Sequence, residues 1–380
     1  MRFNFDEPVD RRGFGSVKWD TTGEEVLPMF VADMDFRSSP QIIEALKAQI
    51  QHGIFGYGQD LEFPEIIKKW FQDTYQVSIK EEWIVLLPAI VPVLAAVSQL
   101  REGRVMIPSP NYHVLLAAPG KAGKETIRSP LKNTNEYYEM DFDDMRRCIE
   151  PDVRLFYLCN PHNPVGRVYT YEELKELSCF AEEKNLIVIS DEAHCGLVFD
   201  GRHHIPFFSV DEYAAEHSIS IMGPGKTYNL AGLPFAFAII PNSTLRQEFN
   251  NTCYSLPDPG ILNVAAAKAA YGSSEPWRLQ LVDYLQGNRD YFETALREHF
   301  PAVKLTHVEG TYLQWVDFRP LGIEDPYQWL LDEVKILPNK GKPFGLEGYV
   351  RFNLGTTRAR LEEAIGRITD GLKKRQGSPV

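Results

Sequence analysis

The chain has 380 residues, of which 44% are hydrophobic and 24% charged, as in globular proteins large enough for two domains. Its formal net charge of -12 argues against a nucleic-acid partner, because binding to a phosphate backbone needs concentrated Lys and Arg. The longest apolar run, residues 83–97, is too short to cross a bilayer and contains Pro88 and Pro92. The sequence therefore predicts a protein that binds neither nucleic acid nor membrane.

The start of the chain and its cysteines predict a cytoplasmic location. The opening stretch MRFNFDEPVDRRG is charged and has no apolar segment of the kind that a secretory signal contains. The five cysteines are odd in number and form no C-x-x-C pair, which is typical of reduced thiols. We expect a cytoplasmic protein without a metal site.

The N-terminal part of the chain is predicted to contain two helices and then a strand. Apolar residues at helical spacing indicate helices over 40–51 and 64–77, separated by the glycine-rich loop HGIFGYG. The run WIVLL (83–87) predicts a strand, and residues 92–100 predict a helix that begins at a proline.

Short apolar strands then alternate with helices. The predicted strands cover residues 104–108, 154–160, 186–190, 218–222 and 235–240. A capping box of Thr170 and Glu173 marks the start of a helix over 169–185. Strands that are apolar throughout, without alternation, indicate a largely parallel sheet buried on both faces.

The C-terminal part is predicted to form a smaller α+β domain. It contains predicted helices over 263–271, 277–298 and 357–374, a hairpin over 303–318 and a strand over 349–354. We expect the chain to divide into an N-terminal arm (1–45) that packs with the small domain, a large domain (46–272) and the small domain itself (273–380).

The stretch SIMGPGKT (220–227) raises the possibility of a nucleotide-binding loop. It lacks one glycine of that pattern, because Ser220 occupies the first glycine position. A nucleotide-binding loop also leads into a long helix, whereas Gly232 and Pro234 limit any helix here to about two turns. The pattern therefore argues against nucleotide binding and leaves Lys226 available for another role.

Three residues suited to one cofactor follow the ends of predicted strands. Asn163, Asp191 and Lys226 each come just after a strand, and open α/β sheets bind ligands beyond the carboxyl ends of their strands. An amine, a carboxylate and an amide suit pyridoxal phosphate, which offers an aldehyde, a basic ring nitrogen and a phenolic oxygen. We expect these three residues to form a site for pyridoxal phosphate.

Seen together, the motifs resemble a known family over nearly the whole chain. They are VKWD (17–20), VADMDF (31–36), HGIFGY, CNPHNPVGRV, SDEAH, GKTYNLAGL and GYVRFNL. The chain resembles the fold-type I pyridoxal-phosphate enzymes of the class I/II aminotransferase superfamily, and most closely their cystathionine β-lyase (C–S lyase, MalY/PatB-like) branch. The resemblance implies an α/β fold with a mostly parallel seven-stranded sheet and a smaller α+β domain.

The resemblance also implies how the cofactor is held. Lys226 is expected to bind it as a Schiff base and to remove the Cα proton of the substrate, while Asp191 pairs with the ring nitrogen and Asn163 with the phenolic oxygen. Tyr112 is expected to stack on the ring, and His194 to lie near the phenolic oxygen. The backbone N–H groups expected to face the phosphate are those of Ala89, Ile90 and Val91.

Three more residues carry expectations about the substrate and the assembly. Arg351 matches the arginine that holds the substrate α-carboxylate, and Asp33 lies in a motif that borders the substrate pocket in the family. Tyr57 is expected to reach the cofactor phosphate of the partner subunit, which implies a homodimer. On residue type alone, Tyr57 is equally consistent with a packing aromatic in a tight loop.

Departures from the family pattern separate the possible reactions. Transaminases carry a phosphate-binding Arg eight residues after the lysine, where this chain has Pro234, and this difference favours a lyase. Gly223 and Gly225 replace hydroxyl residues that are common before the lysine. We predict α,β-elimination on L-cystathionine, L-cysteine and related thioether amino acids, with transamination as the alternative and a cofactor-binding regulator as a weaker one.

Overall fold

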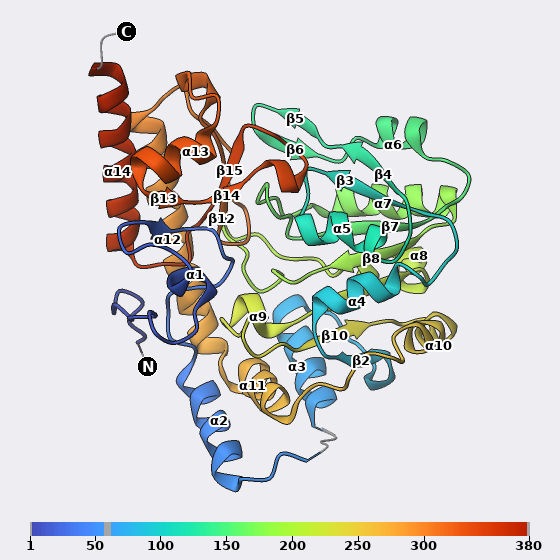
Figure 1. Ribbon diagram of the computed structural model, residues 1–380. Helices are drawn as coiled ribbons and strands as arrows, with labels where there is room; N and C mark the ends of the chain where they lie inside the picture. Colours follow the sequence, from blue (N-terminus) through green and yellow to red (C-terminus); the bar gives the residue numbers. More distant parts are fainter. Residues whose placement is uncertain (1, 57–61, 378–380) are drawn as a thin grey trace.

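A seven-stranded sheet forms the centre of the larger part of the molecule (Figure 1). The computed structural model describes residues 2–56 and 62–377. The strand order is β2–β10–β9–β8–β7–β3–β4, and every neighbouring pair is parallel except the two that involve β10. The strands are β2 (Ile84–Leu87), β3 (Arg104–Ser109), β4 (Thr126–Pro130), β7 (Val153–Cys159), β8 (Ile187–Asp191), β9 (Ser218–Met222) and β10 (Ala236–Ile239). The predicted mostly parallel seven-stranded sheet is confirmed.

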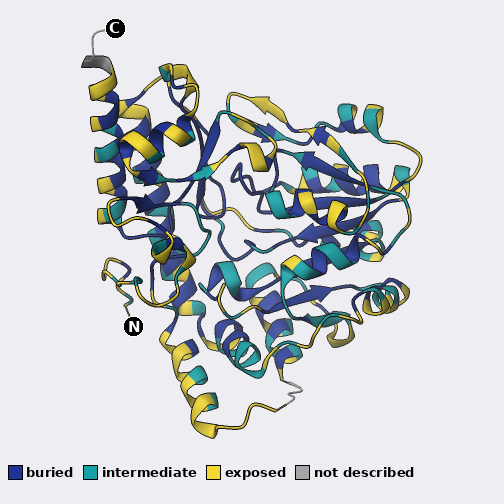
Figure 2. Ribbon diagram, viewed as in Figure 1, coloured by how far each residue is buried: buried dark blue, intermediate teal, exposed yellow. Residues whose placement is uncertain are grey.

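The central strands are mainly apolar because helices cover both faces of the sheet. Along β8, Ile187 and Ile189 pack into one hydrophobic cluster, whereas Val188 between them packs into another. Side chains that alternate along a strand point to opposite faces, so a run without polar residues belongs to a strand buried on both sides. In Figure 2 the central strands, such as β8, are accordingly coloured as buried.

Helices of very different length surround this sheet. One face is covered by α4 (Ile90–Val97), α5 (His113–Lys121) and α10 (Ser243–Thr252). The other is covered by α3 (Phe63–Tyr75), α6 (Phe142–Cys148), α7 (Tyr171–Lys184) and α11 (Ile261–Ser273). The remaining elements of this part are α2 (Pro40–His52), α8 (Glu212–Glu216), α9 (Pro224–Thr227) and the hairpin β5 (Lys132–Thr134) and β6 (Tyr137–Glu139).

The C-terminal part is built on an antiparallel sheet of order β11–β12–β15–β14. Its strands are β11 (Lys304–Leu305), β12 (Leu313–Asp317), β14 (Asn339–Lys340) and β15 (Tyr349–Asn353). Its α-helices are α12 (Glu275–His299), α13 (Pro326–Trp329) and α14 (Arg358–Gly377). Phe292 of α12 and Leu361 of α14 pack with Val316 of β12 in one core. The domain boundaries stay a prediction.

The N-terminal arm lies against this C-terminal part (Figure 1). It contains the one-turn helix α1 (Val17–Asp20) and the short strand β1 (Leu27–Pro28), which pairs in parallel with β13 (Ile336–Leu337). Within the described residues, no helix has both the length and the apolar composition that a membrane span needs.

The start of α4 differs from the prediction in a way that matters for the site. The helix predicted over 92–100 begins at Ile90, so Pro92 lies inside its first turn. Proline is tolerated there because the first four N–H groups of a helix have no intrahelical partner. As a result the start of α4 directly follows β2, with Ala89 as the residue before the helix.

Candidate active site

A cavity of about 380 Å³ opens at the carboxyl-end edge of the large sheet. Eight of the residues predicted for the site line it: Lys226, Asp191, Asn163, Tyr112, His194, Ile90, Val91 and Arg351. Pockets of this size are typical of small-molecule sites.

Three adjacent parallel strands bring the predicted polar residues together. Strands β7, β8 and β9 are neighbours in the sheet, so their carboxyl ends lie at the same edge. Asn163 lies in the loop after β7, Asp191 is the last residue of β8, and Lys226 lies in α9, directly after β9. The convergence predicted from the strand ends is present in the structure.

Asp191 is a buried carboxylate with few partners. Its side chain accepts a hydrogen bond from the backbone N–H of Ala193 at 3.1 Å. Burial raises the pKa of Asp191 from 3.8 to about 6, although this hydrogen bond and the charge of Lys226 act in the opposite direction. The carboxylate therefore suits a cationic partner that enters the cavity.

Lys226 holds its amine against the N-terminal arm. Its Nζ donates a hydrogen bond to the carbonyl oxygen of Ala32 at 2.8 Å. Desolvation of the amine and the nearby charge of Arg351 lower the pKa of Lys226 from 10.5 to about 8. An amine with this pKa is partly neutral at physiological pH and is therefore a nucleophile and a base.

Arg351 is a buried guanidinium without a carboxylate partner among the described residues. It lies on β15 with 3% of its surface exposed. Its Nη1 donates to Asn163 Oδ1 at 2.8 Å, and its Nη2 donates to the carbonyl oxygen of Phe30 at 3.1 Å and to Asn339 Oδ1 at 2.5 Å. All three acceptors are neutral, so the charge of Arg351 favours an anionic ligand in the cavity.

Tyr112 and His194 complete the walls of the cavity. Tyr112 directly precedes α5, and burial raises the pKa of its hydroxyl to about 12, so it stays protonated. His194 is buried, and burial lowers its pKa well below 6.5, so the ring is neutral. Within the described part of the chain, His194 Nδ1 has no hydrogen-bond partner.

Backbone N–H groups are available at the start of α4. Ile90 and Val91 line the cavity in the first turn, and no side chain caps this end of the helix. Uncapped N–H groups and the helix dipole favour an anion at this position. Ala89, predicted as a third phosphate contact, precedes the helix but is not among the residues that line the cavity.

One further predicted residue lies elsewhere in the structure, and another is not among the described residues. Asp33 is on the N-terminal arm, outside the lining of this cavity, and forms an ion pair of 2.7 Å with Arg11. Tyr57 lies outside the described residues. Sequence reasoning missed Asn339, which comes from β14 and orients Arg351, and no motif around it signals this role.

The glycines before Lys226 differ in the space around them. A Cβ added at Gly223 would lie 2.6 Å from the carbonyl oxygen of Phe235, so the close approach of this backbone excludes a side chain. At Gly225 the nearest atom, Ala231 Cα, is 4.0 Å away. The packing of this loop therefore leaves no room at position 223 for a hydroxyl residue.

Comparison with known proteins places the chain in a family. The family model described as aminotransferase class I and II matches residues 24–368. The chain belongs to the aminotransferase class I and II family. A curated relative in it is cystathionine beta-lyase PatB of Bacillus subtilis, which is 35% identical over 97% of this chain and 100% of the relative.

Solved structures agree with this family assignment. Cystalysin from Treponema denticola, which contains pyridoxal 5'-phosphate, is 30% identical with a TM-score of 0.94 over 99% of this chain and 100% of the other. The pyridoxal-phosphate-bound C–S lyase from Staphylococcus hominis is 30% identical with a TM-score of 0.91 over 98% of both chains. The predicted fold type of this aminotransferase family member is confirmed.

Proposed function

We propose that the chain is a pyridoxal-phosphate-dependent carbon–sulfur lyase that acts on L-cystathionine and related L-thioether amino acids. One observation carries the proposal: a single cavity holds an amine of lowered pKa, a buried carboxylate and a guanidinium that has no counter-ion among the described residues. Full-length relatives named cystathionine beta-lyase and C–S lyase support the same activity. The products are pyruvate, ammonia and a thiol, and one water is consumed.

The residues of the cavity fit pyridoxal phosphate. Lys226 offers an amine to its aldehyde, and the buried carboxylate of Asp191 suits a protonated ring nitrogen. Asn163 uses its oxygen for Arg351, which leaves its amide NH2 to donate to the phenolic oxygen. The unpartnered Nδ1 of His194 lies in the same cavity, and the uncapped start of α4 suits the phosphate.

Each of these side chains has a separate role in the reaction. Bound pyridoxal phosphate supplies an aldehyde that condenses with amines and a ring that accepts the electron pair of the substrate Cα. Arg351 orients the substrate by binding its α-carboxylate, and Lys226 takes the proton from Cα as a neutral amine. Asp191 holds a proton on the ring nitrogen. The Cβ–S bond breaks with its electron pair on sulfur, which leaves as the thiol after protonation.

Transamination is the second candidate, because the family includes aminotransferases and the same lysine, aspartate and arginine serve both reactions. Eight residues after Lys226, the chain has the exposed Pro234. This loop position therefore offers no guanidinium to a phosphate, which favours the lyase.

Pyruvate release tests the proposal. The purified protein, loaded with pyridoxal phosphate, is incubated with L-cystathionine without any keto acid, beside a Lys226→Ala control. We expect sustained pyruvate formation that the control loses. Amino transfer to an added keto acid without pyruvate release would assign the protein to the transaminases instead.

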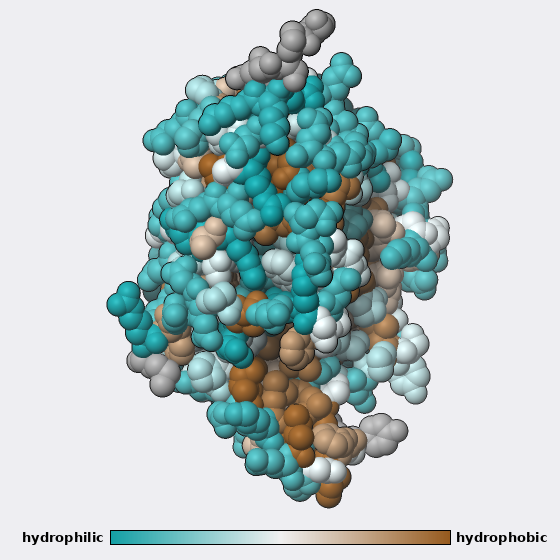
Figure 3. Space-filling model, turned by 60° about the vertical axis from the view of Figure 1, so that its left-hand side comes forward, coloured by the Kyte–Doolittle hydropathy of each residue, from teal (hydrophilic) through white to brown (hydrophobic). Residues whose placement is uncertain are grey.

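We further propose a homodimer, in which Tyr57 reaches the cofactor phosphate of the partner subunit. Large apolar side chains are exposed on α2 and just after it: Ile43, Ile50, Ile54 and Phe55. Figure 3 shows hydrophobic surface gathered at the end of the molecule that contains α2. Sedimentation equilibrium is expected to give twice the mass of the chain, and Ile50→Asp to shift it toward the monomer.

A further inference from the structure

A second cavity of about 660 Å³ lies along the N-terminal arm, beside the active site. Its lining includes Arg11, Phe14, Val17, Val31, Asp33 and Gly232. Val31 lines this arm cavity and the active-site cavity alike, so the two spaces lie on either side of one residue.

The arm forms the wall along which a substrate lies. The carbonyl oxygen of Phe30 accepts from Arg351, and that of Ala32 accepts from Lys226. An amino acid with its carboxylate at Arg351 and its amine directed toward Lys226 therefore lies beside residues 30–32. The arm cavity, which shares the lining residue Val31 with the active-site cavity, is then the space next to the substituent beyond Cβ.

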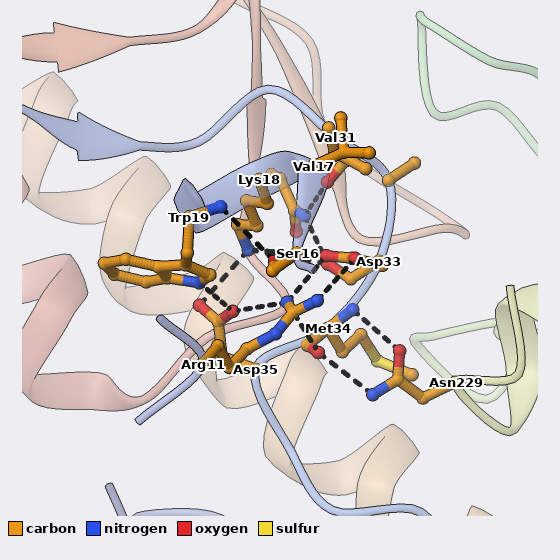
Figure 4. Close-up of polar contacts among 12 residues, drawn as sticks. Arg11, Ser16, Val17, Lys18, Trp19, Val31, Asp33, Met34, Asp35 and Asn229 are labelled. Atoms are coloured by element: carbon orange, nitrogen blue, oxygen red, sulfur yellow. Dashed lines mark hydrogen bonds and ion pairs between the residues drawn. The ribbon is translucent and has the colours of Figure 1, made fainter. Parts of the chain in front are cut away.

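A cluster of charges lies on the N-terminal arm, and two of its members line the arm cavity (Figure 4). The guanidinium of Arg11 pairs with Asp33 through two hydrogen bonds of 2.8 and 2.7 Å and also reaches Asp35 at 2.9 Å. Asp35 pairs in addition with Lys18 and Arg360, both at 3.1 Å. The cluster thus combines three cations with two carboxylates.

Only part of the cluster is accessible to a ligand. The side chains of Lys18 and Asp35 are each 1% exposed, whereas those of Arg11 and Asp33 are 21% and 17% exposed. Of this cluster, the cavity therefore meets one guanidinium and one carboxylate side by side, and Arg37 and Asp10 line the cavity as well. Phe14 and Val17, which are 85% and 63% exposed, add apolar surface to the same cavity.

We propose that this arm cavity is a subsite for the far end of a two-headed substrate, a thioether whose second end carries its own ammonium and carboxylate. Arg11 binds the distal carboxylate, Asp33 binds the distal ammonium, and the apolar side chains cover the methylene groups between them. This subsite rests on the proposed function and assigns the side chains that hold the distal end of its substrate. A structural role for the Arg11–Asp33 pair alone, in fixing the arm, is the competing explanation.

Three substrates separate these explanations. L-Cystathionine carries both distal charges, S-carboxyethyl-L-cysteine carries only the distal carboxylate, and S-ethyl-L-cysteine carries neither. For each variant, the readout is the ratio of kcat/KM between a charged substrate and S-ethyl-L-cysteine, measured by pyruvate release. A loss of folded protein lowers all rates together and leaves these ratios unchanged.

Arg11→Gln is expected to lower both ratios at least tenfold, because it removes a charge-assisted hydrogen bond to the distal carboxylate. Asp33→Asn is expected to lower the ratio for L-cystathionine but not that for S-carboxyethyl-L-cysteine. The matched control is Arg12→Gln, since Arg12 donates to the backbone of Trp19 and Thr22 and does not line the cavity. It is expected to leave both ratios unchanged, and unchanged ratios in Arg11→Gln would overturn the subsite.

Binding to an inactive chain separates the subsite from the reaction. Calorimetry with Lys226→Ala protein, supplemented with pyridoxal phosphate, is expected to show preference for L-cystathionine over S-ethyl-L-cysteine, and the added Arg11→Gln change to remove it. If the wild-type chain releases no pyruvate while this preference is present, the lyase proposal fails and the subsite stands. If the preference is absent or does not depend on Arg11, the subsite fails.

Discussion

Lys226 and Tyr312 donate hydrogen bonds to the same acceptor, the carbonyl oxygen of Ala32, at 2.8 and 2.9 Å. The two donors lie in different parts of the chain, Lys226 after β9 and Tyr312 just before β12. A carbonyl oxygen has two lone pairs and can accept both bonds. The N-terminal arm is therefore held against the lysine by a buried tyrosine from the C-terminal part.

Removal of this phenol is expected to weaken the contact between the arm and the rest of the chain. In Tyr312→Phe the Ala32 oxygen keeps its bond to Lys226, so we expect the free energy of unfolding of the cofactor-free chain to fall by about 1 kcal/mol. Urea unfolding measures this change. The control is Tyr171→Phe, whose more exposed hydroxyl donates to the Val210 carbonyl at 3.3 Å, and its effect is expected within about 0.5 kcal/mol. Equal losses in the two variants would contradict a special role for Tyr312.

The lowered pKa of Lys226 predicts the pH dependence of cofactor attachment. Only the neutral amine attacks the aldehyde, so the rate of attachment is expected to rise with a midpoint near pH 8, the value to which burial and Arg351 lower the pKa from 10.5. The absorbance change on mixing the cofactor-free chain with pyridoxal phosphate measures this rate at each pH.

A second variant tests the cause of that shift. Arg351→Gln removes a positive charge that lowers the pKa of Lys226, so its midpoint is expected to move to higher pH. Lys226→Ala is expected to show no attachment at any pH. A wild-type midpoint at the ordinary lysine value would show that the amine is solvated, against the structure.

How far the sequence predicts this molecule depends on where each signal lies. Strands β7, β8 and β9 are buried over nearly their whole length, so their apolar runs mark them clearly, and Asn163, Asp191 and Lys226 follow their ends. The edge strand β4, with the sequence TIRSP, is only partly buried and carries no such signal. The helix α5 contains Pro119, which obscures its pattern.

The sequence contains no signal for the contacts that form only through tertiary packing. The acceptors of Lys226 and of one Arg351 nitrogen are the backbone carbonyls of Ala32 and Phe30, and a carbonyl acts in the same way whatever its side chain. Asn339 and Tyr312 reach the site from segments that lie more than a hundred residues after Asp191 in the sequence. Neither residue adjoins a recognisable motif. Pairing of distant segments of this kind becomes visible only in the folded chain.

Asp191 is expected to reduce stability while it supports activity. Its pKa is raised from 3.8 to about 6 by burial, so its contribution to stability is fully present below about pH 4 and is lost as the pH rises through 6. In the cofactor-free chain at pH 7, Asp191→Asn is therefore expected to raise the free energy of unfolding by up to about 3 kcal/mol.

Two measurements test the expectation that Asp191 lowers stability and supports activity. Urea unfolding at pH 4 and pH 7 should show the gain of Asp191→Asn at pH 7 only. Pyruvate release by the loaded variant should fall at least about a hundredfold, because a neutral amide cannot hold the proton on the ring nitrogen as a carboxylate does. A variant that is less stable than the wild type at pH 7 would show that the carboxylate is not desolvated in the folded chain.

The two glycines before Lys226 form a matched pair for a packing test. Gly223→Ser places a Cβ 2.6 Å from the carbonyl oxygen of Phe235, so the backbone between β9 and β10 must shift. We expect this change to cost about 1–3 kcal/mol of unfolding free energy. Gly225→Ser adds the same side chain where the nearest atom is 4.0 Å away, and it is expected to cost under about 1 kcal/mol. Urea unfolding of the two cofactor-free variants under the same conditions makes the comparison. Equal costs would mean that the approach of Phe235 does not constrain the loop, and that the absence of a hydroxyl residue at position 223 has another origin.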